Sequence, residues 1–176
     1  MDRPGLYVHV PFCRTKCPYC DFYSVPSLSL VPAWLDAIQR EVLIYRDRFR
    51  PFDSLYLGGG TPTILGSREL ARLMGALFQD LSFSRDPEIT IEANPDDITK
   101  EKTALLRELG FNRISLGVQS LNEKELEFLQ RRHSAKQAEE AIEVIRTSGY
   151  TNLGIDLMYG LPGQSESVWM LSLIHI

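Results

Sequence analysis

Short runs of β-branched and aromatic residues alternate with amphipathic helical patterns along this chain, and this alternation limits the possible folds most strongly. Five segments have the composition of strands: residues 6–10, 54–57, 88–92, 113–118 and 153–158. Between them, apolar residues recur at helical spacing. Strands that are separated by helices form βαβ units and a parallel sheet. The sequence therefore predicts an α/β fold of about five βα units, with parallel strands and outer helices.

The expected helices have recognisable ends. The first covers residues 33–49, where Trp34, Ile38 and Val42 lie on one face. The others run from about 67 to 81, 99 to 110, 122 to 129 and 134 to 149. Each begins at a residue type that caps helix N-termini. These capping residues are Ser67, Thr99, Asn122 and Ser134.

Each expected strand ends in a cluster of polar residues or glycines. No Rossmann glycine fingerprint is present, which favours a barrel or partial barrel over a doubly wound sheet. In both kinds of parallel sheet, ligands bind at the carboxyl ends of the strands. The five clusters would therefore meet in one site. They are residues 13–20, 58–62, 92–95, 117–120 and Asp156 with 160–163.

All three cysteines of the chain, Cys13, Cys17 and Cys20, lie within eight residues. Structural iron–sulfur and zinc sites usually have four protein ligands, and the chain has no fourth cysteine. A C-x3-C-x2-C loop can hold three irons of a cubane cluster and leave the fourth open to a ligand. Three alternatives remain: zinc with His9 as fourth ligand, a disulfide with one free thiol, and inert core cysteines. The missing secretory signal and the neighbouring basic residues argue against the last two.

Glycines and carboxylates complete the expected site. Residues 58–60 are all glycine, so backbone groups there can approach a ligand closely, and an amine or carboxylate suits them better than a polyphosphate. Glu92 and Asp156 could accept hydrogen bonds from ribose hydroxyls or an ammonium group. Buried carboxylates need partners, so the alternative for each is an ion pair with Arg113 or Arg131.

Four further side chains have two interpretations each. Gln119 can hydrogen-bond to a ligand in both directions, or can satisfy loop backbone. Tyr7 and Tyr19 flank the cysteine loop and could line a cofactor pocket or pack in the core. Arg131 could bind a ligand or form a solvated basic pair with its neighbour. We expect His133 to be a surface or capping histidine.

These motifs resemble the radical S-adenosylmethionine (SAM) superfamily, in which C-x3-C-x2-C follows the first strand and Gly-Gly-Gly-Thr-Pro the second. Within the superfamily the chain is similar to the coproporphyrinogen-oxidase-like branch, from residue 6 to about 169. The supporting segments are residues 6–13, 58–63, 91–95, 116–120 and 155–164. The resemblance implies a partial (β/α)6 radical SAM barrel with one strand fewer than the family's six.

Two subfamilies share these motifs. One is the oxygen-independent coproporphyrinogen III oxidase (dehydrogenase), which decarboxylates coproporphyrinogen III to protoporphyrinogen IX. The other is the HemW-type heme chaperone, which binds heme for delivery. The oxidase pattern has a further cysteine where this chain has Phe22, and tends to Val-Gln-Asp where this chain has Val-Gln-Ser at residues 118–120. Both differences favour the chaperone type, with the oxidase as the alternative.

The resemblance also implies cofactors, partners and site residues. Cys13, Cys17 and Cys20 match the ligands of a [4Fe–4S] cluster. SAM would chelate the open iron, and an electron from the cluster would cleave the sulfonium to a 5′-deoxyadenosyl radical. The implied partners are heme or coproporphyrinogen III, an electron donor such as flavodoxin or ferredoxin, and a heme-acceptor protein. The positions that match SAM contacts are Tyr7, Tyr19, Gly59, Gly60, Thr61, Glu92, Gln119, Arg131 and Asp156.

Composition sets the remaining expectations. The 176 residues, 44% hydrophobic and 24% charged, fit one ordinary globular domain. The net charge of −4 gives no reason to expect nucleic acid, and no apolar run reaches membrane-spanning length, so we expect a cytoplasmic protein.

We expect an incomplete radical SAM core domain over residues 1–170. Residues 171–176 fit a strand better than a helix end, and are expected to be a truncation or foreign tail, with a native sixth strand as the alternative. With the family's C-terminal domain absent, we expect marginal stability and no turnover.

Overall fold

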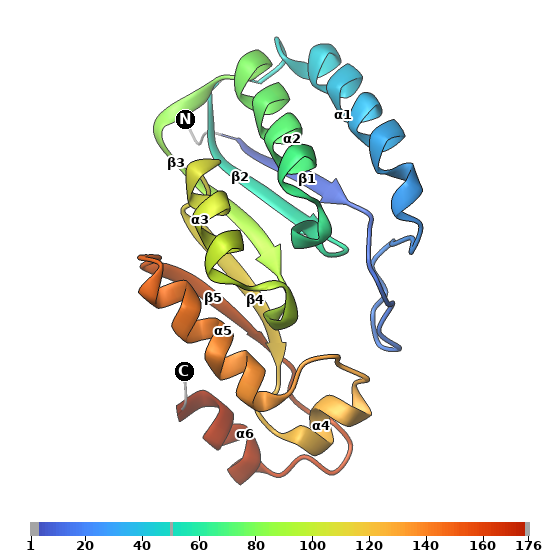
Figure 1. The fold of residues 1–176 in the computed structure, drawn as a ribbon, viewed down its shortest axis with the longest axis vertical. Helices are drawn as coiled ribbons and strands as arrows, with labels where there is room; N and C mark the ends of the chain where they lie inside the picture. Colours follow the sequence, from blue (N-terminus) through green and yellow to red (C-terminus); the bar gives the residue numbers. More distant parts are fainter. Residues whose placement is uncertain (1–3, 50, 175–176) are drawn as a thin grey trace.

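The computed structural model describes residues 4–49 and 51–174 and contains one open sheet of five parallel strands (Figure 1). The strands lie in chain order, each paired with the next. This arrangement confirms the α/β prediction and matches a partial barrel. Within the described ranges the sheet has no sixth strand. The strands are β1 (Gly5–Val10), β2 (Phe52–Gly59), β3 (Phe83–Ala93), β4 (Arg113–Gln119) and β5 (Asn152–Leu157).

The helices connect these strands, and three of the expected N-caps are confirmed. The side chains of Thr99, Asn122 and Ser134 accept backbone N–H groups of the following turn. Ser67 is different, because Gly66 occupies the N-cap position and Ser67 is already helical. The helices are α1 (Val31–Tyr45), α2 (Ser67–Asp80), α3 (Lys100–Glu108), α4 (Glu123–Phe128), α5 (Ala135–Thr147) and α6 (Glu166–Ile174), with short 3-10 turns η1 (Leu28–Leu30), η2 (Pro62–Ile64) and η3 (Pro95–Asp97).

Helix α1 covers a shorter and earlier range than the sequence pattern suggested. It begins before Pro32 and ends at Tyr45, instead of covering residues 33–49. Proline fits the first turn of a helix because its missing N–H would have no helical partner there. Hydrogen bonding beyond Tyr45 continues only as a turn, in which the Arg48 amide donates to the Tyr45 carbonyl.

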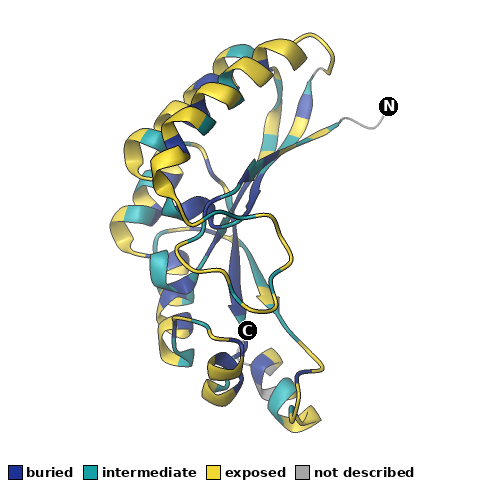
Figure 2. Cartoon of the chain, turned by 90° about the vertical axis from the view of Figure 1, so that its right-hand side faces the viewer, coloured by how far each residue is buried: buried dark blue, intermediate teal, exposed yellow. Residues whose placement is uncertain are grey.

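The sheet has one apolar and one polar face. Helices gather on one side of it (Figure 2), and the strand residues Leu57, Ile91 and Leu116 are fully buried. Because side chains alternate along a strand, the residues between them project from the opposite face. There the sequence has polar residues instead: Tyr7, Tyr56, Glu92, Ser115 and Asp156. The polar face and the carboxyl ends of its strands therefore carry the site.

The C-terminal segment corrects one prediction. Residues 171–174 continue α6 and do not form a strand, while residues 175–176 lie outside the described residues. Ser165 immediately precedes the helix; its carbonyl accepts the Trp169 amide and its hydroxyl accepts the Val168 amide. Strand propensity is weak without a partner strand, so local helical bonding prevails. No helix in the described residues is long and apolar enough to cross a membrane.

Candidate cofactor site at the carboxyl ends of the strands

A cavity of about 180 Å³ opens at the carboxyl ends of the strands, and we call it the rim cavity. Residues from every strand end and from the cysteine loop line it. The three cysteines and all the positions matched to SAM contacts except Tyr7 line it, whereas residues 160–163 do not. The lining comprises Cys13, Thr15, Lys16, Cys17, Tyr19, Cys20, Phe22, Gly59, Gly60, Thr61, Glu92, Ala93, Asn94, Ser115, Gly117, Gln119, Arg131 and Asp156.

The cysteine loop, residues 11–25, is closed at its base by backbone hydrogen bonds. The amide of Val25 donates to the Pro11 carbonyl at 2.7 Å, and the amide of Cys13 donates to the Val25 carbonyl at 3.3 Å. Next to this base, the Thr61 amide donates to the Phe12 carbonyl at 2.7 Å. These bonds fix the two ends of the loop against β2 and leave its middle, with the thiols, over the rim cavity.

The three thiols are free and face one cavity, but they are not gathered into a finished metal site. Among the described residues, no three side chains of Cys, His, Asp or Glu form a group that could hold a metal as they stand. The sulfur of Cys13 lies 3.5 Å from the Thr61 hydroxyl, and all three cysteines are partly buried. Three soft thiolate donors around one cavity fit an iron–sulfur cluster chemically.

His9 does not stand ready as a fourth ligand. Its Nδ1 lies 3.1 Å from the Tyr7 hydroxyl, and its Nε2 lies 2.9 Å from the Tyr23 carbonyl. Because a carbonyl only accepts, Nε2 carries the proton. His9 therefore ties the end of the cysteine loop to β1, which counts against the zinc alternative.

The glycines after β2 permit close packing of backbone and side chains. Gly59 has φ +110, and a Cβ atom there would lie 2.4 Å from the His9 ring. A Cβ on Gly60 would lie 2.5 Å from the Phe12 carbonyl oxygen. Only glycine combines this backbone conformation with such close approach. The glycines thus let β1 and the cysteine loop pack directly against β2.

Glu92 is held by two donors from β2. The Tyr56 hydroxyl donates to its Oε1 at 2.8 Å, and the Gly59 amide donates to its Oε2 at 3.0 Å. Burial, followed by the bond to Glu92, raises the pKa of Tyr56 to about 12, so its proton stays in place. Among the described residues Glu92 forms no ion pair. Arg113, one of its two expected partners, pairs with Glu88 at 3.2 Å instead. Glu92 keeps lone pairs that can accept from a ligand.

Asp156 faces the same cavity from β5. The Ser115 hydroxyl lies 3.3 Å and 3.4 Å from its two carboxylate oxygens. Burial raises the pKa of Asp156, while Ser115 and then Arg113 oppose that rise. A carboxylate with a single hydroxyl partner retains acceptor capacity toward ligand hydroxyls or an ammonium group.

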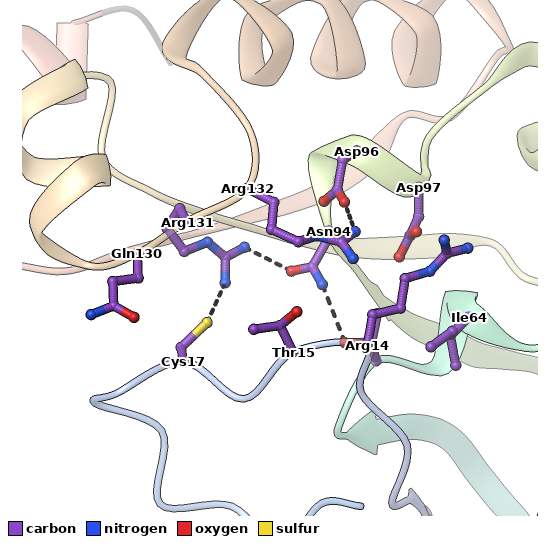
Figure 3. Close-up of a pocket in the computed structure, with 11 residues that line it drawn as sticks. Arg14, Thr15, Cys17, Ile64, Asn94, Asp96, Asp97, Gln130, Arg131 and Arg132 are labelled. Atoms are coloured by element: carbon purple, nitrogen blue, oxygen red, sulfur yellow. Dashed lines mark hydrogen bonds and ion pairs between the residues drawn. The ribbon is translucent and has the colours of Figure 1, made fainter. Parts of the chain in front are cut away.

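Arg131 links the cysteine loop to β3 and β4 (Figure 3). Its Nη2 donates at 2.7 Å to both the Asn94 side-chain oxygen and the Gly117 carbonyl. Its Nη1 lies 3.2 Å from the Tyr19 hydroxyl and 3.6 Å from the Cys17 sulfur. This side chain is thus neither a solvated cation nor the partner of a carboxylate.

The end of β4 contains an irregularity that brings Gln119 to the cavity. Gln119 has φ 70, a conformation uncommon for residues other than glycine, and the β4–β5 register shifts between Gly117 and Gln119. A bulge re-aims a side chain in this way, and bulges occur next to functional sites. The sequence pattern predicted that Gln119 faces a site but not the bulge that puts it there.

His133 is buried, which corrects its predicted surface or capping role. Only 3% of it is exposed, and its Nε2 lies 3.0 Å from the Val118 carbonyl. Burial, followed by the nearby Arg131, lowers its pKa to about 4. His133 follows two arginines and precedes a capping serine, and these polar neighbours suggested a surface position. No sequence signal indicates that a histidine will be buried beneath a bulge.

Tyr7 lies apart from the rim cavity. It is 53% exposed, and its ring stacks on Tyr56 with centroids 6.1 Å apart. The expected site did not include Tyr56 or Ser115, and it included Asn94 only as part of the 92–95 cluster. These residues hold Glu92, Asp156 and Arg131 respectively. Strand alternation was the available signal for Tyr56 and Ser115, because each shares the polar face with its partner carboxylate.

Comparisons with known proteins agree with this geometry. Heme chaperone HemW of Haemophilus influenzae is 35% identical over 169 residues, covering 92% of this chain and 44% of that protein. HemW of Bacillus subtilis is 40% identical over 166 residues, with the same coverage. Coproporphyrinogen III oxidase (HemN) of Escherichia coli superposes with a TM-score of 0.88 at 34% identity, covering 98% of this chain and 41% of that one. The chain spans less than half the length of these relatives. The radical SAM superfamily model matches residues 7–172, and the chain belongs to that superfamily.

Proposed function

We propose that this chain is the SAM-binding part of a heme chaperone of the HemW type. In this proposal it binds a [4Fe–4S] cluster and SAM, and the protein that contains it transfers heme to acceptor proteins in the cytoplasm. The observation that carries the proposal is the meeting of all three cysteines with the strand-end residues in one cavity. The 35–40% identity to heme chaperones supports the chaperone type.

The residues around the cavity would divide the work. Cys13, Cys17 and Cys20 would hold three irons, and the cluster with SAM would supply one-electron cleavage of the sulfonium. Glu92 and Asp156 would accept hydrogen bonds from the ribose hydroxyls or the ammonium group of SAM. The list of proposed SAM contacts is completed by Tyr19, Gly59, Gly60, Thr61, Gln119 and Arg131 in the rim cavity, and by Tyr7, which lies outside it.

The first experiment is EPR on anaerobically reconstituted, dithionite-reduced chain, with and without SAM. We expect a [4Fe–4S]⁺ signal that changes when SAM is added. The matched control replaces all three cysteines by alanine, which should remove the iron and the signal. Zinc in place of iron in the reconstituted chain would contradict the proposal.

A second candidate function is coproporphyrinogen III oxidation, favoured by the superposition on HemN. Phe22 argues against it, because this exposed aromatic lines the cavity where the oxidase pattern has a further cysteine. The two functions are separated with full-length protein containing this segment, reduced by flavodoxin or ferredoxin. Tight heme binding and transfer to an acceptor without decarboxylation support the chaperone, whereas release of protoporphyrinogen IX supports the oxidase.

A further inference from the structure

Two successive carbonyl groups at the end of β4 are bound by two side chains from the segment that precedes α5. The Gly117 carbonyl accepts from Arg131 Nη2 at 2.7 Å, and the Val118 carbonyl accepts from His133 Nε2 at 3.0 Å. The Val118 carbonyl also accepts the Ser120 amide at 2.9 Å. The segment therefore holds the backbone of β4 at the point where its register with β5 shifts.

The bulge explains why a buried donor is needed here. Gly117 pairs with Asp156 and Gln119 pairs with Leu157, so Val118 has no partner on β5. An extra residue in a bulge leaves its backbone groups outside the ladder, so a buried carbonyl there must find its donors elsewhere. The Val118 carbonyl has two donors, the Ser120 amide within the bulge and the buried ring of His133.

The protonation state of His133 follows from this geometry. A carbonyl oxygen only accepts, so Nε2 carries the hydrogen. The other ring nitrogen, Nδ1, is buried and has no hydrogen-bond partner among the described residues. Neutral histidine is therefore favoured, which agrees with its low pKa and with two arginines nearby.

We propose that His133 is a positioning residue that acts through Gln119. By binding the Val118 carbonyl it stabilises the bulge, and the bulge holds Gln119 at φ 70 with its side chain at the rim cavity. His133 itself does not line that cavity. The expected effect of His133 on SAM binding rests on the proposed function. Its expected effect on the bulge does not, because the bulge is present in the chain without metal or SAM.

The structural half is tested by hydrogen exchange of the metal-free chain. In His133→Leu, which removes the donor, we expect the Ser120 amide to exchange about 10- to 100-fold faster. In His133→Gln, whose amide can donate near the Nε2 position, exchange should stay within about threefold of wild type. Thermal unfolding of both variants shows whether the whole fold is retained. Equal protection of Ser120 in a folded His133→Leu variant would overturn the proposal.

The functional half is tested by SAM affinity of the reconstituted chain. We expect His133→Leu to weaken SAM binding about tenfold with unchanged iron content, and His133→Gln to restore it. If His133 acts through Gln119, the double variant with Gln119→Ala binds no more weakly than Gln119→Ala alone. Losses that multiply would overturn the proposed route. If the wild-type chain fails to bind SAM, the proposed function fails, and the exchange experiment still decides the role of His133.

Discussion

The guanidinium of Arg131 lies 3.6 Å from the sulfur of Cys17, although the two residues are 114 positions apart. The same side chain reaches the end of β4 through the Gly117 carbonyl. One residue therefore joins the cysteine loop to the strand that carries Gln119. A planar guanidinium can bind several partners in fixed directions, which an ammonium cannot do.

The substitution Arg131→Lys keeps the positive charge but should weaken the attachment of the cysteine loop. A lysine can keep at most part of the four contacts, and each lost bond to a charged group is worth about 1.5–3 kcal/mol. We expect iron loss to a chelator to become about 10- to 100-fold faster. Arg132→Lys is the matched control, since Arg132 forms an ion pair with Asp96 instead. Equal iron retention by the Arg131 and Arg132 variants would refute this role.

Gly59→Ala should destabilise the fold before any cofactor binds. The substitution puts a Cβ 2.4 Å from the His9 ring at φ +110, and backbone strain of this kind costs about 1–3 kcal/mol. We expect the free energy of unfolding to fall by about 2 kcal/mol in urea denaturation. Gly75→Ala in α2 is the control: beyond its neighbours in the chain and the backbone of its own helix, its added Cβ would have no atom within 4 Å, so it should stabilise by about 0.5–1 kcal/mol. Equal effects at both sites would contradict the packing argument.

The buried carboxylate of Glu125 should stabilise the connection between β5 and α6. It accepts from the Ser120 hydroxyl at 2.6 Å and from Gln164 Nε2 at 2.9 Å. Both donors bind the same carboxylate oxygen, Oε2, so Glu125→Leu removes the acceptor of both and should cost about 1–3 kcal/mol. Urea denaturation measures the loss, with the exposed Glu127→Leu in the same helix as control. A difference between the two variants below about 0.5 kcal/mol would exclude this stabilisation.

The parallel sheet with its helices and the meeting of the strand ends at one edge could be predicted because both follow from the alternation of strand and helix patterns. Apolar residues such as Leu57 and Ile91 alternate with Tyr56 and Glu92, and parallel strands put their carboxyl ends at one rim. These rules need no knowledge of distant contacts. They therefore placed Glu92 correctly at a cavity, although not its bonds to Tyr56 and Gly59.

The parts that sequence reasoning missed depend on contacts between distant segments. Glutamine has no sequence signature for φ 70, and this conformation occurs where the β4–β5 register shifts and where His133 binds the neighbouring Val118 carbonyl. The burial of His133 depends on how the segment before α5 passes under β4. In α6, apolar residues suggested a strand, but the local hydrogen bonds from Ser165 decided in favour of a helix.

His133 should make stability depend on pH in a definite direction. Its pKa in the folded chain is about 4, mainly because of burial, and an unfolded histidine has a pKa of about 6.5. Above pH 6.5 both states are neutral and pH has no effect through this residue. Between pH 6.5 and 4 the unfolded state binds the proton and the folded state does not, so stability falls with falling pH.

The full loss should amount to about 3 kcal/mol, because each unit of pKa difference corresponds to about 1.4 kcal/mol. Urea denaturation at several pH values, for wild type and His133→Gln, measures it. Carboxylates such as Asp156 titrate in both proteins, so their effects cancel in the difference between the two curves. The free energy of unfolding of wild type relative to that of His133→Gln should fall as pH falls from 6.5 to 4 and then stay constant. Parallel curves would mean that the folded state accepts the proton as readily as the unfolded chain, and that the bond to Val118 does not depend on a neutral ring.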